Sequence, residues 1–205
     1  MSAAKVAAAA LLLLLAGGAD ADAPREDADA KARAWFTDAP LVTQQGKPVR
    51  FYTDVLKDKV VVIDFIFTRC AGACPILTER MNAVRRELGP LFGEKVRFVS
   101  ISIDPEYDTP QALASFAKVH KAEHPEWLFL TGKKADIKAV VSRLGQWTEE
   151  ASEHSTLFIA GNARERHWTK IRLDTPAQSF AMQVRKLVDG AAVLPAAAAA
   201  AEPAR

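Results

Sequence analysis

The feature that most constrains this chain is the stretch of residues 60–75, VVVIDFIFTRCAGACP. Residues 60–67 form a nearly unbroken apolar run rich in β-branched residues and Phe, which predicts a strand buried on both faces. The only two cysteines follow, Cys70 and Cys74, and then Pro75, which suits the start of a helix. The pattern therefore predicts that both thiols lie between a central strand and a helix, where α/β sheets place their chemistry.

The elements around this stretch predict the fold class. Helices are expected from Pro75 to Gly89, from Thr109-Pro110, over 137–144, and from the capping box at 175–178 to Gly190. Further strands are expected at 96–103 and 127–130, and an antiparallel pair at 156–160 and 168–173. The turn signal Gln45-Gly46-Lys47 within residues 41–57 predicts a hairpin before the central strand. This order predicts one three-layer α/β domain with a mixed sheet.

The two ends of the chain read differently from this domain. Residues 1–23 resemble a cleavable signal peptide, with Lys5, an apolar core at 6–16 and a small-x-small site ending at 21 or 23. The apolar core is short for a bilayer span, so export to the periplasm is favoured over a membrane-anchored form. Residues 24–38 are expected to be a linker, 39–190 the folded domain, and 191–205 a disordered Ala/Pro tail.

The net charge of +2 with interspersed signs argues against a nucleic-acid partner, and the oligomeric state is unknown.

In an exported protein the cysteine pair has three possible uses: a structural disulfide, a redox centre or a metal site. A disulfide closing so small a loop would add little stability. Three residues separate Cys70 from Cys74, whereas thioredoxin-type exchange centres have two. Two thiolates are soft ligands that suit Cu(I) and Zn. If Cys74 caps the helix, the helix dipole lowers its pKa, and Arg69 adds positive charge nearby.

A metal site needs a further ligand, and four histidines are candidates: His120, His124, His154 and His167. His120, His124 and His167 occupy polar surroundings typical of surface residues. His154 lies in the loop that leads into an apolar strand, where an ordinary loop histidine is the simpler interpretation. Together with the two cysteines, however, it suggests a trigonal Cys-Cys-His site.

The segment FTRCAGACPILT, with EHSTLFIAG 80 residues further on (154 − 74), resembles the Sco/SenC family of copper-delivery proteins. Residues 102–105, SIDP, and 108–110, DTP, support the resemblance, which covers roughly residues 40–190. It implies a thioredoxin-like α/β fold with an N-terminal hairpin and an inserted strand and helix. It also implies a copper ion, Cu(I) or Cu(II), held by Cys70, Cys74 and His154. The implied recipient is the binuclear copper centre of cytochrome c oxidase, on its copper-binding subunit.

Other functions stay open. A thiol–disulfide reductase would use Cys70 and Cys74 as a catalytic redox pair on the oxidase copper-site cysteines, without His154 as a ligand. Either function needs a periplasmic partner, a thiol reductant or a copper donor. A zinc site with the same ligands is chemically possible. A peroxiredoxin is disfavoured, because only Arg69 separates Thr68 from Cys70 where that motif has two residues.

Overall fold

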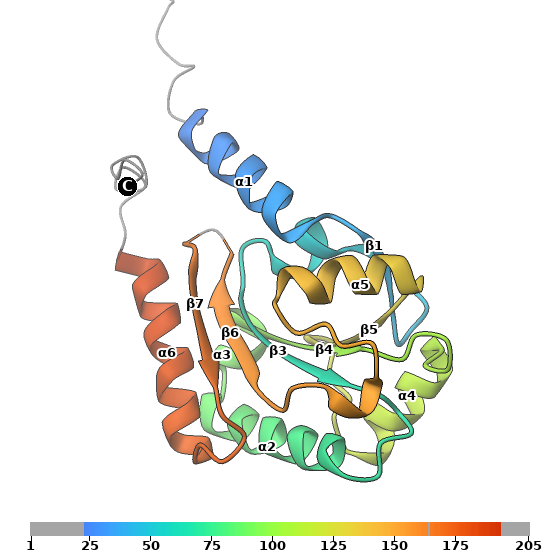
Figure 1. Ribbon diagram of the computed structural model, residues 1–205. Coiled ribbons are helices and arrows are strands. Elements are labelled where there is room, and N and C mark those ends of the chain that lie inside the picture. Colours follow the sequence, from blue (N-terminus) through green and yellow to red (C-terminus); the bar gives the residue numbers. More distant parts are fainter. Residues whose placement is uncertain (1–22, 164, 194–205) are drawn as a thin grey trace, which may run out of the picture.

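The computed structural model describes residues 23–163 and 165–193, and within them seven strands form a single mixed sheet (Figure 1). The strand order is β2-β1-β5-β4-β3-β6-β7. The strands are β1 (Pro40–Thr43), β2 (Pro48–Arg50), β3 (Val60–Ile66), β4 (Val96–Ser102), β5 (Trp127–Thr131), β6 (Phe158–Asn162) and β7 (His167–Ile171). The predicted hairpin is confirmed as the antiparallel pair β1–β2, and the predicted late pair as β6–β7.

The apolar run predicted as the central strand is β3, and all seven of its residues are buried. It pairs in parallel with β4 and antiparallel with β6, so both its edges are covered. Successive side chains of a strand point to opposite faces, so β3 contributes to two cores. Val62 and Ile66 belong to one apolar cluster, and Ile63 and Phe65 to the other.

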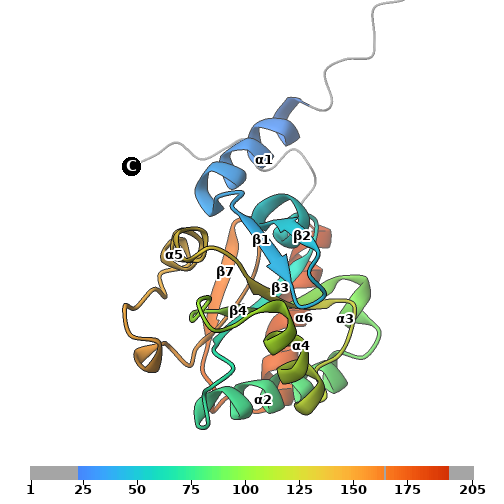
Figure 2. The same ribbon diagram turned by 90° about the vertical axis from the view of Figure 1, so that its right-hand side faces the viewer.

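Helices cover both faces of the sheet (Figures 1 and 2). One face packs against α2 (Ala73–Leu88), α3 (Leu91–Glu94), α4 (Pro110–Val119) and α6 (Ala177–Val193). The other packs against α1 (Ala23–Phe36), the π-helix η1 (Phe51–Leu56) and α5 (Lys134–Arg143). A 3₁₀ turn, η2 (Ala151–Glu153), precedes β6. The predicted α/β architecture is confirmed, including the start of α4, where the Thr109 hydroxyl caps the helix by accepting from Ala112 N at 3.2 Å.

The ends of the chain differ from expectation. The segment predicted as a linker forms α1 over most of its length, because Ala32 and Phe36 bury against the sheet and Phe36 packs 5.0 Å from the Trp168 ring. Helix α6 continues past Gly190 to Val193. The signal peptide predicted over 1–23 and the tail predicted over 191–205 lie almost entirely outside the described residues. Within the described ranges, no helix is long and apolar enough to cross a membrane.

Candidate metal and redox centre

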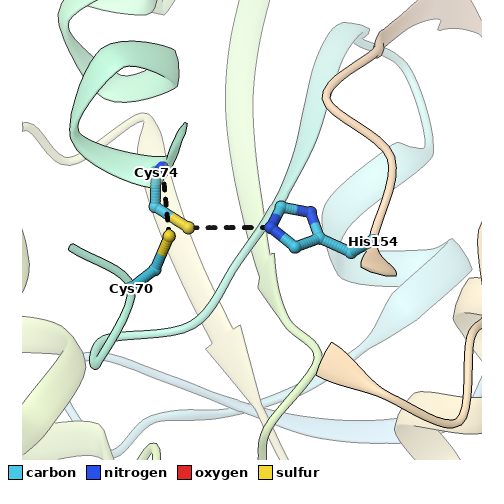
Figure 3. A group of neighbouring side chains, drawn as sticks. All are labelled: Cys70, Cys74 and His154. Atoms are coloured by element: carbon cyan, nitrogen blue, oxygen red, sulfur yellow. Dashed lines mark hydrogen bonds between the residues drawn. The ribbon is translucent and has the colours of Figure 1, made fainter. Parts of the chain in front are cut away.

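The structure brings the three predicted ligands together at one edge of the sheet (Figure 3). One ligand atom from each of Cys70, Cys74 and His154 lies within 4.8 Å of the others. The Cys74 Sγ is 3.8 Å from the His154 Nε2, and both cysteines are free thiols. Two sulfurs and one imidazole nitrogen converge without any backbone rearrangement, so the set can bind a single soft or borderline metal ion.

The cysteine loop is short and ordered by its own backbone. After β3 ends, the Cys70 N–H donates to the Phe67 carbonyl at 3.1 Å, which turns the chain toward α2. Helix α2 begins at Ala73 with Gly72 as its N-cap, so Cys74 and Pro75 both lie in the first turn. The Cys74 N–H donates to the Cys70 Sγ at 3.4 Å. Cys70 therefore sits over the helix start, the position that the sequence had suggested for Cys74.

The two thiols differ in acidity for this reason. Burial alone would raise the pKa of Cys70, but hydrogen bonds from the Cys74 thiol and from the backbone N–H groups of Cys74, Gly72 and Ala73 outweigh it and lower the pKa. Burial raises the pKa of Cys74 well above its usual range, and donation to Cys70 raises it further. The sequence predicted a lowered pKa for Cys74 on the condition that this residue caps the helix. Gly72 is the N-cap instead, and the pKa of Cys74 is raised, first of all by burial. Cys70 is therefore the more acidic thiol of the pair, and Cys74 the less acidic one.

His154 reaches the cysteines from the loop between η2 and β6. Its Nδ1 lies 3.0 Å from the Ser155 carbonyl, which can only accept, so Nδ1 carries the proton and the Nε2 lone pair faces Cys74. The Phe67 ring contacts the imidazole edge-on, with 5.7 Å between centroids. Burial lowers the pKa of His154, and the bond to Ser155 only partly opposes this. The imidazole is therefore neutral at pH 7, as a metal ligand must be.

The other histidines lie elsewhere. The His120 ring packs on Phe116 and the His124 ring on Phe92, and His167 is exposed on β7. Within the described part of the chain, the three residues of the site are the one group of potential ligands that meets.

Arg69 does not turn toward the sulfurs. Its guanidinium pairs with Asp104 at 2.8 Å and lies 3.6 Å from the centre of the Tyr107 ring. The positive charge of Arg69 is therefore paired with the loop after β4. It does not lie beside the thiols, where the sequence had suggested it.

Two buried carboxylates near the site were not predicted as site residues. Asp108 accepts hydrogen bonds from the Thr68 N–H and hydroxyl and from the Ser102 hydroxyl. Thr68 is 40 residues from Asp108 in sequence, and the only signal for these contacts was the pair of motifs at 102–105 and 108–110.

The second carboxylate is Asp64, in the middle of β3, and neither of its oxygens has a hydrogen-bond partner among the described residues. Ser100 sits at the paired position on β4, but its hydroxyl accepts from Trp127 Nε1 and lies outside hydrogen-bonding geometry with Asp64. Burial raises the pKa of Asp64 to about 7 and outweighs the opposing influences of Ser100 and of the Asp64 backbone. The Asp64 charge in turn contributes to the raised pKa of Cys74.

A mixed sheet with helices on both faces, and a Cys-x₃-Cys loop facing a histidine at its edge, defines a thioredoxin-like protein with a candidate thiolate–imidazole metal site. The SCO1/SenC family model matches residues 28–189, and the chain belongs to this family. The family resemblance read from the cysteine and histidine motifs is thereby confirmed.

Individual relatives agree with this assignment. The SCO1 protein homolog of Bacillus subtilis is 39% identical over 127 residues, which cover 58% of this chain and 64% of the relative. A putative copper-binding protein of Stutzerimonas stutzeri is 30% identical over 105 residues, 51% of this chain and 49% of that protein. The matches thus span between about half and two thirds of these relatives.

Solved structures extend the comparison. Bradyrhizobium japonicum ScoI with copper bound superimposes with a TM-score of 0.62 at 25% identity, covering 73% of this chain and 96% of that one. Arabidopsis thaliana ScoI with copper bound gives a TM-score of 0.62 at 26% identity, covering 74% and 96%. BsSco, a member of the Sco family of cytochrome c oxidase assembly proteins in which a disulfide switch was identified, gives 0.61 at 26% identity, covering 73% and 91%.

Proposed function

We propose that this protein is a periplasmic copper chaperone that binds one copper ion through Cys70, Cys74 and His154. The observation that carries the proposal is the convergence of two free thiols and a neutral imidazole within 4.8 Å of one another. Thiolate sulfur and imidazole nitrogen are ligands that copper prefers in both of its oxidation states. The copper-bound structures of two similar Sco proteins support the choice of copper over zinc.

A site of three ligands, of which Cys70 and His154 are only half-buried, suits transfer of the ion rather than its permanent retention. We infer that the recipient is the copper-binding subunit of cytochrome c oxidase, at its binuclear centre. The description of BsSco as a member of a family of oxidase assembly proteins supports this inference. Export by a cleavable signal at residues 1–23, leaving the domain of residues 39–190 in the periplasm, is part of the proposal. N-terminal sequencing of the protein from the periplasmic fraction tests the cleavage.

Copper binding is tested by titrating the fully reduced protein with Cu(I) in competition with a chromogenic Cu(I) chelator. One equivalent should bind tightly. Cys70→Ser, Cys74→Ser and His154→Ala each remove a ligand, so each should lose more affinity than the about 10- to 100-fold typical of an outer-shell residue. His167→Ala, on the exposed face of β7, is the matched control and should bind as the wild type does. Unchanged binding in all three ligand variants would reject the site.

A second function is favoured by one observation, the unequal acidity of the thiols. Cys70 is half-buried with a lowered pKa, and Cys74 is buried with a raised pKa. We propose that the same pair can reduce a disulfide between copper-site cysteines of the recipient. The Cys70 thiolate attacks one sulfur of that disulfide and forms a mixed disulfide, while the other recipient sulfur leaves as a thiolate. Cys74 then loses its proton and attacks Cys70, which releases the recipient's second thiolate and leaves a Cys70–Cys74 disulfide.

Variants separate this activity from metal binding. With a disulfide-bonded peptide as substrate and no copper present, Cys74→Ser should accumulate a mixed disulfide at Cys70, detectable by mass spectrometry. His154→Ala should keep the rate of mixed-disulfide formation at Cys70, because the imidazole faces Cys74 and not the attacking sulfur. Trapping at residue 74 in a Cys70→Ser variant, with none at Cys70 in the Cys74→Ser variant, would overturn the assigned roles.

A further inference from the structure

A buried carboxylate from a neighbouring loop holds the residues that lead into the cysteine loop. Asp108 lies between β4 and α4 and is fully buried. One of its oxygens, Oδ1, accepts from the Thr68 hydroxyl at 2.5 Å and from the Thr68 N–H at 3.1 Å. The other, Oδ2, accepts from the Ser102 hydroxyl at 2.6 Å.

These bonds connect two loops that are 40 residues apart in sequence. Thr68 is two residues before Cys70, and Ser102 is the last residue of β4. The Ser102 hydroxyl also accepts from the Asp104 N–H at 3.1 Å, and Asp104 pairs with Arg69. Both residues immediately before Cys70 are therefore fixed to the loop of residues 102–109. We call the Asp108 carboxylate and its two hydrogen-bonding partners, Thr68 and Ser102, the Asp108 clamp.

We propose that Asp108 is a positioning residue, which through Thr68 holds Cys70 over the start of α2 in the arrangement that accepts a metal ion. The inference rests on the proposed function, since it assigns the clamp to the same Cys70–Cys74–His154 site. Asp108 does not touch the sulfurs and acts only through the backbone of the cysteine loop.

The arrangement of the sulfurs explains why such a clamp matters. In this dithiol state the Cys70 Sγ accepts from the Cys74 N–H, and the Cys74 Sγ lies 3.8 Å from the His154 Nε2, so the loop already holds both sulfurs toward one point. A loop held in this geometry loses little conformational entropy when an ion binds, which is the advantage of preorganisation. A loop released from Asp108 must be ordered by the ion, and it can also move Cys70 more easily into a bond with Cys74.

The test compares Thr68→Val, which removes the clamping hydroxyl but keeps the shape, with Thr68→Ser, which keeps the hydroxyl. Thr109→Val is the matched control, because the Thr109 hydroxyl caps α4 beside Asp108 without touching the cysteine loop. Two quantities are measured for each variant: Cu(I) affinity by chelator competition, and the thiol–disulfide equilibrium with glutathione. In that equilibrium glutathione disulfide is reduced to two glutathione thiols as Cys70 and Cys74 lose two protons and two electrons.

Thr68→Val should lower Cu(I) affinity by about 10-fold, the range found for residues that orient metal ligands. The equilibrium constant for forming its Cys70–Cys74 disulfide should rise about 10-fold, which corresponds to a reduction potential about 30 mV more negative. Thr68→Ser should stay close to the wild type in both measurements. Thr109→Val should lose stability in urea while both site measurements stay unchanged.

A Thr68→Val variant that behaves like Thr109→Val, less stable but unchanged in both site measurements, would overturn the proposal and leave Asp108 a purely structural residue. The two proposals fail separately. If the wild type binds no copper, the chaperone function is rejected, while the glutathione equilibrium still decides whether the clamp positions Cys70. Asp108→Asn extends the series, and Thr68→Val alone carries the test if that variant does not fold.

Discussion

Replacing Asp64 with asparagine should remove a pH dependence of stability that the buried carboxyl imposes. The pKa of Asp64 is raised to about 7 from its usual 3.8, first of all by burial. Below pH 3.8 the carboxyl is protonated in both the folded and the unfolded states. Between pH 3.8 and 7 the unfolded chain releases the proton while the folded protein keeps it, so stability falls as pH rises and levels off above pH 7.

The size of the effect follows from the two pKa values. The difference between 7 and 3.8 corresponds to about 4 kcal/mol of lost stability at high pH, as an upper value. Over the convenient range from pH 5 to pH 8, the loss is about 2.5 kcal/mol. Asparagine does not titrate, so the unfolding free energy of the variant lacks this pH-dependent contribution, whatever its absolute value. Titrating groups that do not interact with Asp64 are common to both proteins and cancel in the comparison.

The assay is urea unfolding of the reduced, metal-free wild type and Asp64→Asn at pH 5, 6, 7 and 8. The difference in unfolding free energy, variant minus wild type, should rise by about 2.5 kcal/mol across this range and flatten near pH 8. A difference that stays constant with pH would show that Asp64 titrates normally in the folded protein. The assignment of its environment as dry and unpaired would then be wrong.

Three further outcomes are expected. Iodoacetamide at neutral pH should alkylate Cys70 well before Cys74, because only the Cys70 pKa is lowered; mass spectrometry of peptides measures this, and equal rates would contradict the assigned acidities. Phe36→Ala should destabilise the protein by about 3 kcal/mol in urea, because the ring is buried; a negligible loss would mean that α1 is not part of the folded domain. Gly161→Ala should destabilise it by about 1–3 kcal/mol, because a Cβ there would lie 2.5 Å from neighbouring atoms of β7, whereas Gly190→Ala, in open space, should not; equal stability of the two variants would refute the tight β6–β7 approach.

Much of the fold could be predicted because its signals are local. The apolar run of β3 and the proline and glycine boundaries of α2 and α4 lie within single short windows of sequence. Helix α1 was missed because it is anchored by only a few buried side chains, among them Ala32 and Phe36, in an otherwise charged segment. The π-helix η1 has no local signal that separates it from a strand continuing the hairpin.

The candidate site divides in the same way. The cysteines and His154 were found through residue type, spacing and family resemblance. The thiol whose pKa the helix start lowers depends on the residue at which α2 begins. Helix α2 begins at Ala73, two residues before Pro75. The contacts of Asp108 join loops far apart in the chain, and the dry surroundings of Asp64 depend on the whole sheet. Neither can be inferred from any short stretch of sequence.

The positions of the three ligands in the sequence determine when during folding the complete site forms. Two ligands come from one turn, whereas the third arrives on the segment that precedes β6, a strand that pairs with β3 only when the sheet is assembled. A still unfolded chain therefore offers an incoming ion no more than the two sulfurs of the cysteine loop. All three ligands meet only after β6 has paired with β3, so the complete site is a property of the folded protein.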